Sequence, residues 1–266
     1  MQALAAFAPG CLKDTRAVIT GGGSGICRGI ALAYAQLGAE VAIVGRRQEV
    51  LDQTARDIEG LTRRPVLPVA ADVRDSDAMC RTMETVKQRL GGIDTLVNGA
   101  AGNFLAPAAA LSPKGFRTVV DIDLFGSFHA CQAAFDALCR SQRGLIINIS
   151  ATLHYHGTPL QVHASAAKAG VDALTKNLAV EWARFAIRVV GIAPGPVGDT
   201  EGMRRLAPGA AGASMKASVP LGRFGHIEEI AAAAVFLRSS AATYITGTTL
   251  VVDGGQSIAQ PGVGLG

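Results

Sequence analysis

Runs of consecutive apolar residues, rich in valine and isoleucine, recur along the whole chain. Apolar side chains at successive positions are typical of strands that are buried on both faces of a parallel sheet. The pattern predicts strands at residues 17–20, 40–44, 65–70, 94–98, 145–150, 187–193 and 249–253.

Stretches with apolar residues at helical spacing separate these runs. They predict helices near residues 26–37, 48–58, 76–90, 115–140, 162–185 and 227–237. Strands that alternate with helices favour an α/β fold, because each right-handed crossover places a helix on one face of the sheet or the other. We therefore expect a Rossmann-type, doubly wound parallel β-sheet of about seven strands with helices on both faces.

Neither an internal repeat nor a linker interrupts this order, so residues 1–266 are expected to form a single NADP(H)-binding domain. With 49% hydrophobic and 17% charged residues, the chain can bury a full core. The one shift in composition, toward small residues, predicts a substrate lid at about 198–222.

Charge and cysteine content exclude several classes of protein. The net charge of +4 is small and dispersed, which argues against nucleic acid as a partner but suits a small polyanionic ligand. No apolar run approaches the ~20 residues of a membrane span, so no membrane partner is expected. The five cysteines are odd in number and widely spaced, which is typical of reduced thiols and not of a disulfide framework.

The first turn carries a candidate binding site. The stretch "TGGGSGICRGI" at 20–30 follows the first predicted strand and opens the first helix. A glycine cluster alone also fits an ordinary turn, but in this context its backbone N–H groups and the helix N-terminus can face a pyrophosphate. The candidate cofactor-binding residues here are Gly21, Gly23, Ser24, Gly25 and Ile26.

The end of the second strand indicates which dinucleotide is bound. The sequence there is "VGRRQE", with Arg46 and Arg47 where an NAD-binding protein has a carboxylate for the ribose hydroxyl. Two guanidiniums and no acid favour a 2′-phosphate, so we expect NADPH as the cofactor. Alternatively, one or both arginines are merely solvated at the start of a helix.

Several motifs in order along the chain resemble those of the short-chain dehydrogenase/reductase family. They are "TGGGSGI", "ADV" (71–73), "LVNGAAG" (96–102), "APGP" (193–196), "PLGRFG" (220–225) and "VVDGG" (251–255). The resemblance implies that Asp72 and Val73 flank the adenine. It further implies that the cofactor is lined by Asn98, Gly99 and Ala100, and its nicotinamide by Pro194, Gly195 and Val197.

One residue departs from the family's glycine motif. Cys27 stands where the family usually has its third glycine. A side chain at this position is expected to crowd the helix against the strand slightly. The departure puts the affinity for the cofactor in doubt, but not the fold.

The usual catalytic set of this family is asparagine, serine, tyrosine and lysine, and only Lys168 remains. Ala151 stands at the serine position, Ala164 at the tyrosine position and Asp123 at the asparagine position. Reduction of a carbonyl needs a proton on oxygen in step with hydride, so alcohol–ketone chemistry is disfavoured. Reduction of an alkene conjugated to a thioester needs only a stabilised enolate and a proton on carbon.

A subfamily shares this altered site. The segments "VNGAAGNFLAP" (97–107), "DIDLFGSF" (121–128), 151–183 and "APGPVGDTEGMRRL" (193–206) resemble the peroxisomal type of 2,4-dienoyl-CoA reductase. The resemblance implies that Asp123 and Lys168 are the catalytic pair and that NADPH reduces a 2,4-dienoyl-CoA to a trans-3-enoyl-CoA in β-oxidation of unsaturated fatty acids. Lys168 would also bind the nicotinamide ribose. The alternatives to catalysis are that Asp123 is a helix carboxylate bonded to backbone and that Lys168 is an exposed helix lysine.

Other residues are candidates for contact with an acyl-CoA thioester. Asn103 and Phe104 are expected to line the acyl pocket, unless they only pack. Arg204 and Arg205, in the predicted lid, are expected to meet the CoA phosphates, with a solvated pair as the alternative. Tyr155 could replace the lost hydroxyl, although a loop tyrosine at a pocket edge more often packs.

His154 and His156 form an H-x-H pair without a nearby cysteine, aspartate or glutamate, so no metal is expected. Two other functions stay open: a different acyl-CoA or carbonyl reductase of the same family that uses Tyr155, and a non-catalytic NADP(H)-binding scaffold. A homotetramer and a peroxisomal location follow only from the resemblance. The chain ends "GVGLG" without an S-K-L-type address, so a cytoplasmic location is the other expectation.

Overall fold

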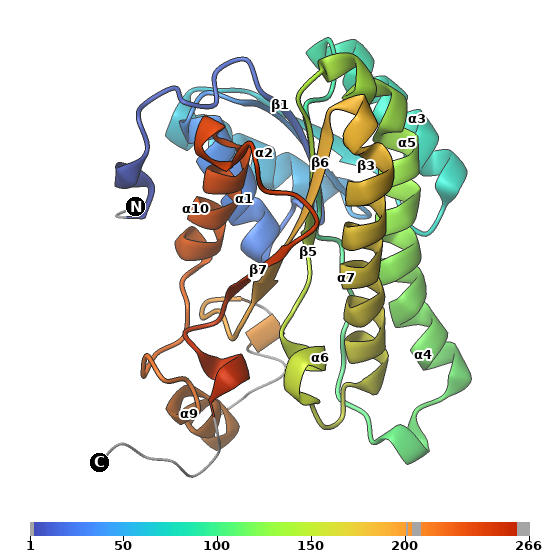
Figure 1. Cartoon of the computed structure of the whole chain (residues 1–266), viewed down its shortest axis with the longest axis vertical. Coiled ribbons are helices and arrows are strands. Elements are labelled where there is room, and N and C mark those ends of the chain that lie inside the picture. Colours follow the sequence, from blue (N-terminus) through green and yellow to red (C-terminus); the bar gives the residue numbers. More distant parts are fainter. Residues whose placement is uncertain (1–2, 201, 204–208, 260–266) are drawn as a thin grey trace.

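The computed structural model describes residues 3–200, 202–203 and 209–259. Its centre is a sheet of seven parallel strands in the order β3-β2-β1-β4-β5-β6-β7 (Figure 1). The strands are β1 Arg16–Thr20, β2 Glu40–Gly45, β3 Val66–Ala70, β4 Thr95–Asn98, β5 Gly144–Ile149, β6 Ile187–Pro194 and β7 Thr249–Val252. Pro68 fits within β3 because this is an edge strand, where a missing N–H can face away from the ladder.

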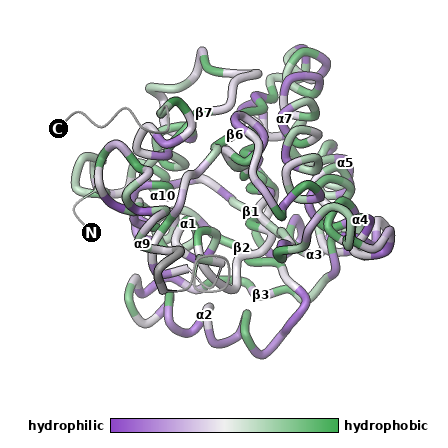
Figure 2. The backbone as a smooth tube through the Cα atoms, turned by 90° about the horizontal axis from the view of Figure 1, so that it is seen from below, coloured by the Kyte–Doolittle hydropathy of each residue, from purple (hydrophilic) through white to green (hydrophobic). Residues whose placement is uncertain are grey.

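Helices cover both faces of the sheet, as Figures 1 and 2 show. One layer contains α1 Gly25–Gln36, α2 Gln48–Thr62 and α10 Ile227–Arg238. The other contains α3 Ser76–Leu90, α4 Pro113–Val120, α5 Gly126–Ser141 and α7 Val162–Trp182. Shorter helical segments are Ala3–Ala6, Ala108–Ala110, α6 Leu153–His156, Ala183–Phe185, α9 Ala210–Ala217, Ser240–Ala242 and Gln256–Ile258.

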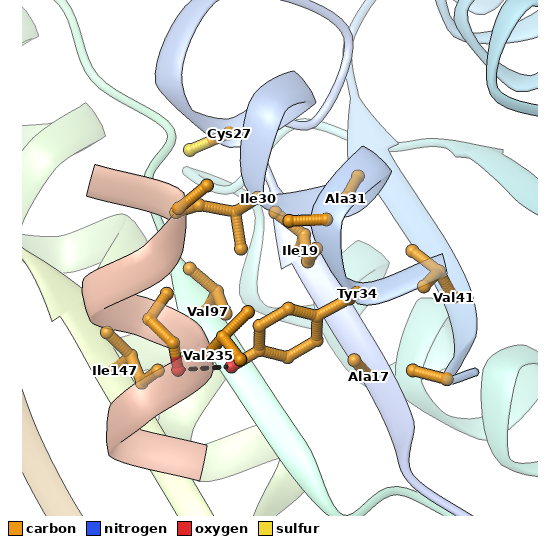
Figure 3. Packing of buried hydrophobic residues seen from close by; sticks show 14 of the residues in the cluster. Ala17, Ile19, Cys27, Ile30, Ala31, Tyr34, Val41, Val97, Ile147 and Val235 are labelled. Atoms are coloured by element: carbon orange, nitrogen blue, oxygen red, sulfur yellow. Dashed lines mark hydrogen bonds between the residues drawn. The ribbon is translucent and has the colours of Figure 1, made fainter. Parts of the chain in front are cut away.

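The apolar core is split by the sheet into two clusters. Alternate strand residues face opposite layers, so that Ile19 packs toward α1 and α10 while Val18 packs toward α3 and α5. Tyr34 on α1 is fully buried, and its hydroxyl donates to the Ala234 carbonyl of α10 over 2.9 Å (Figure 3). Burial on both faces explains why the strands are apolar at consecutive positions.

The predicted fold class is confirmed, and the strand positions agree closely with the sequence pattern. The helix expected near 115–140 differs in one respect, because a π-helical turn at Asp121–Phe125 lies between α4 and α5. The predicted lid at 198–222 lies partly outside the described residues, and its described part includes α9. Among the described helices, none is both long and apolar enough to cross a membrane.

Candidate active site

The carboxyl ends of β1, β2 and β3 surround a hollow of about 150 Å³. Eight of the predicted cofactor-binding residues line it: Gly21, Gly23, Ser24, Arg46, Arg47, Asp72, Val73 and Ala100. These residues come from four separate segments of the chain, and the fold brings them to one edge of the sheet. This is the crevice in which open α/β sheets bind ligands.

The glycine-rich turn has the geometry that a bound pyrophosphate requires. Gly21 has a φ of +70°, and a Cβ there would lie 2.7 Å from the Gly99 carbonyl oxygen. Ser24 precedes α1 without capping it through its side chain, so the first N–H groups of this helix keep their capacity to bind an anion. Ile26 is half-buried in the first turn of α1, which begins at Gly25. The residues present therefore fit a dinucleotide phosphate.

The arginines at the end of β2 are placed to meet a further phosphate. Arg46 and Arg47 are both exposed, and neither forms an ion pair with any carboxylate in the described part of the chain. The nearby Asp72 carboxylate is already engaged, because it accepts from the Arg74 Nε over 3.0 Å. This hydrogen bond is the main reason why the pKa of Asp72 is lowered. Its charge is balanced mainly by Arg74, and Arg46 adds a weaker electrostatic interaction without an ion pair. Both guanidiniums at the end of β2 therefore remain exposed to an anion.

Cys27 is buried at the start of α1 (Figure 3). A Cβ built at Gly99 would overlap the Cys27 sulfur, so the thiol fills the space that Gly99 leaves open. The crowding expected at this departure from the family motif is therefore absorbed by a glycine on the loop after β4. Burial raises the pKa of the Cys27 thiol to about 12, so it is neutral and serves as a packing group.

The remaining predicted cofactor residues differ in what their side chains do. Asn98 is buried, and its Nδ2 donates to the Asn148 Oδ1 over 2.9 Å, so its side chain points into the interior. Pro194 and Val197 are also buried. Gly195 permits close packing, since a Cβ there would lie 2.6 Å from the Asp253 Cβ. Contact of these segments with a cofactor would run mainly through backbone atoms.

Asp123 and Lys168 lie next to each other in the interior, close to the carboxyl ends of β4 and β5. Asp123 is 1% exposed and Lys168 is 7% exposed, and the Lys168 Nζ lies 3.2 Å from the Asp123 Oδ2. The Lys168 Nζ also donates to the Ile149 carbonyl over 2.8 Å. A lysine ammonium has three N–H donors. The described residues supply acceptors for two of them, which leaves one for a ligand.

The π-helical turn explains how Asp123 reaches this position. Such turns insert one extra residue into a helix and are frequent at functional sites. The Asp123 Oδ1 accepts from the Gly102 N–H over 2.7 Å, and the Ser127 hydroxyl donates to the Asp123 carbonyl over 2.6 Å. The plainer interpretation, a carboxylate bonded to backbone, thus holds for one oxygen, while the other oxygen faces Lys168.

Tyr155 belongs to a different cluster. Its hydroxyl donates to the Asp172 Oδ2 over 3.0 Å, and the His154 Nε2 lies 2.9 Å from the same oxygen. The Thr249 hydroxyl lies 3.2 Å from the Asp172 Oδ1. Burial, followed by the charge of Asp172, raises the pKa of Tyr155. Tyr155 is therefore held as a protonated donor to Asp172 and makes no bond to the Asp123–Lys168 pair.

The predicted acyl-pocket residues contact the start of α7. The Asn103 Nδ2 donates to the Gln161 Oε1 over 2.5 Å, and the Phe104 ring lies 4.4 Å from the His163 ring, centroid to centroid. Arg204 and Arg205 lie outside the described residues. Within the described ranges, no group of three or more His, Cys, Asp or Glu side chains is arranged to hold a metal ion.

Three residues of this region were not predicted as parts of a site: Gln161, His163 and Asp172. Asp172 follows Lys168 by four positions, so helical spacing alone places the two on one face of α7. His163 immediately precedes Ala164 at the tyrosine position, and this neighbourhood could have marked it as a site residue. Nothing in the sequence ties Gln161 to Asn103, because that contact depends on how the loop after β4 folds.

Comparison with known proteins yields similar chains of nearly the same length. Residues 21–257 match the family described as enoyl-(acyl carrier protein) reductase. The peroxisomal 2,4-dienoyl-CoA reductase [(3E)-enoyl-CoA-producing] of Arabidopsis thaliana is 45% identical over 264 residues, which span 96% of this chain and 88% of that protein. The protein of the same name from Danio rerio is 44% identical over 250 residues, with 94% and 83% covered.

A solved structure matches as well. The crystal structure of a short chain dehydrogenase from Bacillus anthracis is 41% identical and superposes with a TM-score of 0.84. The match covers 94% of this chain and 99% of that one. Identity at this level over nearly the whole of both chains indicates a shared family as well as a shared fold.

Proposed function

The chain belongs to the short-chain dehydrogenase/reductase family, and from that premise we propose that it reduces 2,4-dienoyl-CoA to trans-3-enoyl-CoA with NADPH. The observation that carries the proposal is the buried Asp123–Lys168 pair in a site whose tyrosine and serine positions are Ala164 and Ala151. Relatives at 44–45% identity are named for this reaction and for the (3E) product.

The electron balance of the reaction suits this site. NADPH held at the glycine-rich turn would supply the hydride as a two-electron reductant and would leave as NADP⁺. The hydride forms a C–H bond at C5 of the dienoyl group, the two double bonds shift to C3–C4 and C1–C2, and negative charge collects on the thioester oxygen. A proton then forms a bond to C2, and the electron pair of the enolate returns to the carbonyl. Protonation occurs on carbon, so the step needs no acid aimed at the oxygen.

Each member of the pair has a distinct role in this scheme. The free donor of Lys168 would bind the cofactor ribose, and its positive charge would favour developing negative charge nearby. Asp123 is held rigidly by the Gly102 N–H and by Lys168. It would orient a water molecule that delivers the proton to C2.

The preference for NADPH rests on Arg46 and Arg47. Both are exposed at the rim of the hollow that the glycine-rich turn forms, and neither has an ion-pairing counter-charge in the described part. A ribose 2′-phosphate would supply that counter-charge through charge-assisted hydrogen bonds.

Assembly and location are proposed from the relatives alone. The chain would act as a homotetramer, as expected for the family, and in a peroxisome or a related organelle, since the relatives are named peroxisomal. Size-exclusion chromatography with light scattering tests the first point, and the location of a fluorescent fusion tests the second.

The assay that tests the proposed function follows NADPH oxidation with three substrates, a 2,4-dienoyl-CoA, a 2-enoyl-CoA and a 3-oxoacyl-CoA. The proposal expects turnover of the dienoyl-CoA above the other two, with a 3-enoyl product by mass spectrometry and NMR. Preference for the 3-oxoacyl substrate would point to a carbonyl reductase that uses Tyr155. No turnover with any substrate, together with tight NADPH binding, would indicate a scaffold.

A further inference from the structure

His163 is a buried polar side chain without a partner. It lies in the first turn of α7, its residue exposure is 0%, and neither ring nitrogen makes a hydrogen bond in the described structure. A neutral imidazole has one N–H donor and one acceptor, and burying such groups unpaired costs free energy. A side chain that bears this cost is a candidate for binding a ligand.

The surroundings of His163 place it beside the catalytic pair. The Phe104 ring, itself 37% exposed, lies 4.4 Å from the imidazole and is tilted by 38° against it. Phe104 belongs to the same loop as Gly102, whose N–H binds the Asp123 carboxylate. The loop after β4 thus contacts both His163, through Phe104, and Asp123, through Gly102, and Asp123 in turn pairs with Lys168.

A second unpaired atom lies on this loop. The Oδ1 of Asn103 is buried and has no partner in the described structure, although its Nδ2 is bound to Gln161. Two neighbouring residues of the loop, Asn103 and Phe104, therefore contact the start of α7, where polar atoms of Asn103 and His163 have no partner. These atoms are buried, and the half-exposed Phe104 ring packs against the His163 ring, so a ligand that reaches them would meet them away from solvent.

We propose that His163 donates a hydrogen bond to the thioester oxygen of the bound dienoyl-CoA and stabilises the enolate. It would supply the oxygen-binding donor that Ala151 and Ala164 cannot provide. This inference rests on the proposed function, because the oxygen in question is that of a dienoyl thioester. His163 acts as a donor in this role and transfers no proton, since the reaction's proton goes to C2.

The charge state of His163 is consistent with that role. Burial lowers the pKa of its imidazolium, and the nearby Phe104 carbonyl and the Asp123 charge oppose this effect only in part. The Phe104 carbonyl is close to the ring but does not meet hydrogen-bond geometry. The ring is therefore neutral near pH 7, and a neutral N–H donor in a dry site is well suited to a developing oxyanion.

The test compares H163F, which keeps a planar ring without a donor, with H163Q, which keeps a donor. H156F serves as the matched control, because His156 is an exposed histidine of the preceding helix α6. We expect H163F to lower kcat by roughly 10²-fold while the affinity for NADPH, measured by fluorescence, changes by less than about twofold. H163Q should recover kcat to within about tenfold of the wild type, and H156F should match the wild type.

A spectroscopic measurement separates a direct contact from a structural role. The conjugated thioester absorbs in the near ultraviolet, and a hydrogen bond to its oxygen moves that band to longer wavelength. A dienoyl-CoA bound to the enzyme with NADP⁺ should show this shift in the wild type and in H163Q, but not in H163F.

The outcomes also separate this inference from the proposed function. If the wild type reduces dienoyl-CoA and H163F retains its kcat and its spectral shift, the role of His163 is refuted while the function stands. Loss of kcat in H163F with an unchanged spectral shift would likewise overturn it, since the oxygen contact would then be intact. If the wild type itself fails to reduce a dienoyl-CoA, the proposed function fails first.

Discussion

The two halves of the sheet's carboxyl edge handle charge in opposite ways. Beside β2, Arg46 and Arg47 are exposed and form no ion pair with the described residues. Beside β4 and β5, Asp123 and Lys168 are almost fully buried and face each other over 3.2 Å. The two arginines can form an ion pair only with a bound anionic ligand, whereas Asp123 and Lys168 pair with each other inside the protein.

This difference separates binding from turnover. Groups that gain their partner only from the ligand contribute to affinity, while a rigid, paired and buried group can act on the reacting atoms without reorganising. Substitutions in the exposed half should therefore change the affinity for the cofactor, and substitutions in the buried half should change kcat.

Lys168 is the residue for which both effects should coincide. K168A removes the ribose donor and leaves the Asp123 carboxylate buried without its counter-charge. We expect kcat to fall by roughly 10²–10⁴-fold and NADPH to bind more weakly. Single-turnover kinetics together with fluorescence titration would check this. A variant with normal NADPH affinity would remove the proposed ribose contact.

Arg46 and Arg47 should affect affinity alone. The double variant R46A/R47A should weaken NADPH by about 1.5–3 kcal/mol, the range for a hydrogen bond to a charged group, and leave NADH nearly unchanged. R64A is the matched control, because Arg64 is exposed on the loop before β3. Calorimetric titration with both cofactors measures the difference, and an equal loss for NADPH and NADH would refute the 2′-phosphate contact.

Cys27 on α1 and Gly99 after β4 pack against each other and should behave as a coupled pair. G99A would force a methyl group into the Cys27 sulfur, so it should lower the free energy of unfolding by about 1–3 kcal/mol. C27G alone should cost less, and C27G/G99A should recover much of the loss, with a coupling of about 0.5–3 kcal/mol. Urea denaturation of the four proteins gives the cycle, and additive losses would show that the thiol does not fill the space above Gly99.

Arg204 and Arg205 are expected to give the smallest effect. R204A/R205A should raise the KM for the CoA thioester by a few fold at unchanged kcat, because a contact with CoA phosphates is the same in the ground and transition states. Raising the salt concentration should raise the wild-type KM and leave that of the variant almost constant. An unchanged KM in the variant would mean that both arginines are only solvated.

The sequence allowed the cofactor half to be predicted more fully than the reaction half. Strands buried on both faces are apolar at consecutive positions, and the glycine-rich turn lies within one short segment, so both are visible locally. The proximity of Asp123 to Lys168 was implied by resemblance, since no local pattern links residues that far apart. In the structure the two side chains are buried and form an ion pair.

What the sequence did not predict depends on tertiary contacts. The helical pattern at 115–140 continues through Asp121–Phe125, so the π-helical turn that presents Asp123 is invisible in it. The buried His163 ring packs against Phe104, which comes from a loop far away in the sequence. Tyr155 was a candidate acid by position, and only the fold shows that its hydroxyl is bound to Asp172.

Asp123 is expected to arrange the proton that goes to carbon, and a comparison of its variants with a Tyr155 variant tests this role. Turnover of D123A and D123N with a 2,4-dienoyl-CoA should be measured beside Y155F, with NADPH affinity determined for all three. We predict that both Asp123 variants bind NADPH almost normally and lose roughly 10²–10⁴-fold in kcat, while Y155F keeps nearly the wild-type rate. Wild-type turnover in the Asp123 variants together with an inactive Y155F would contradict the account and assign the acid to Tyr155.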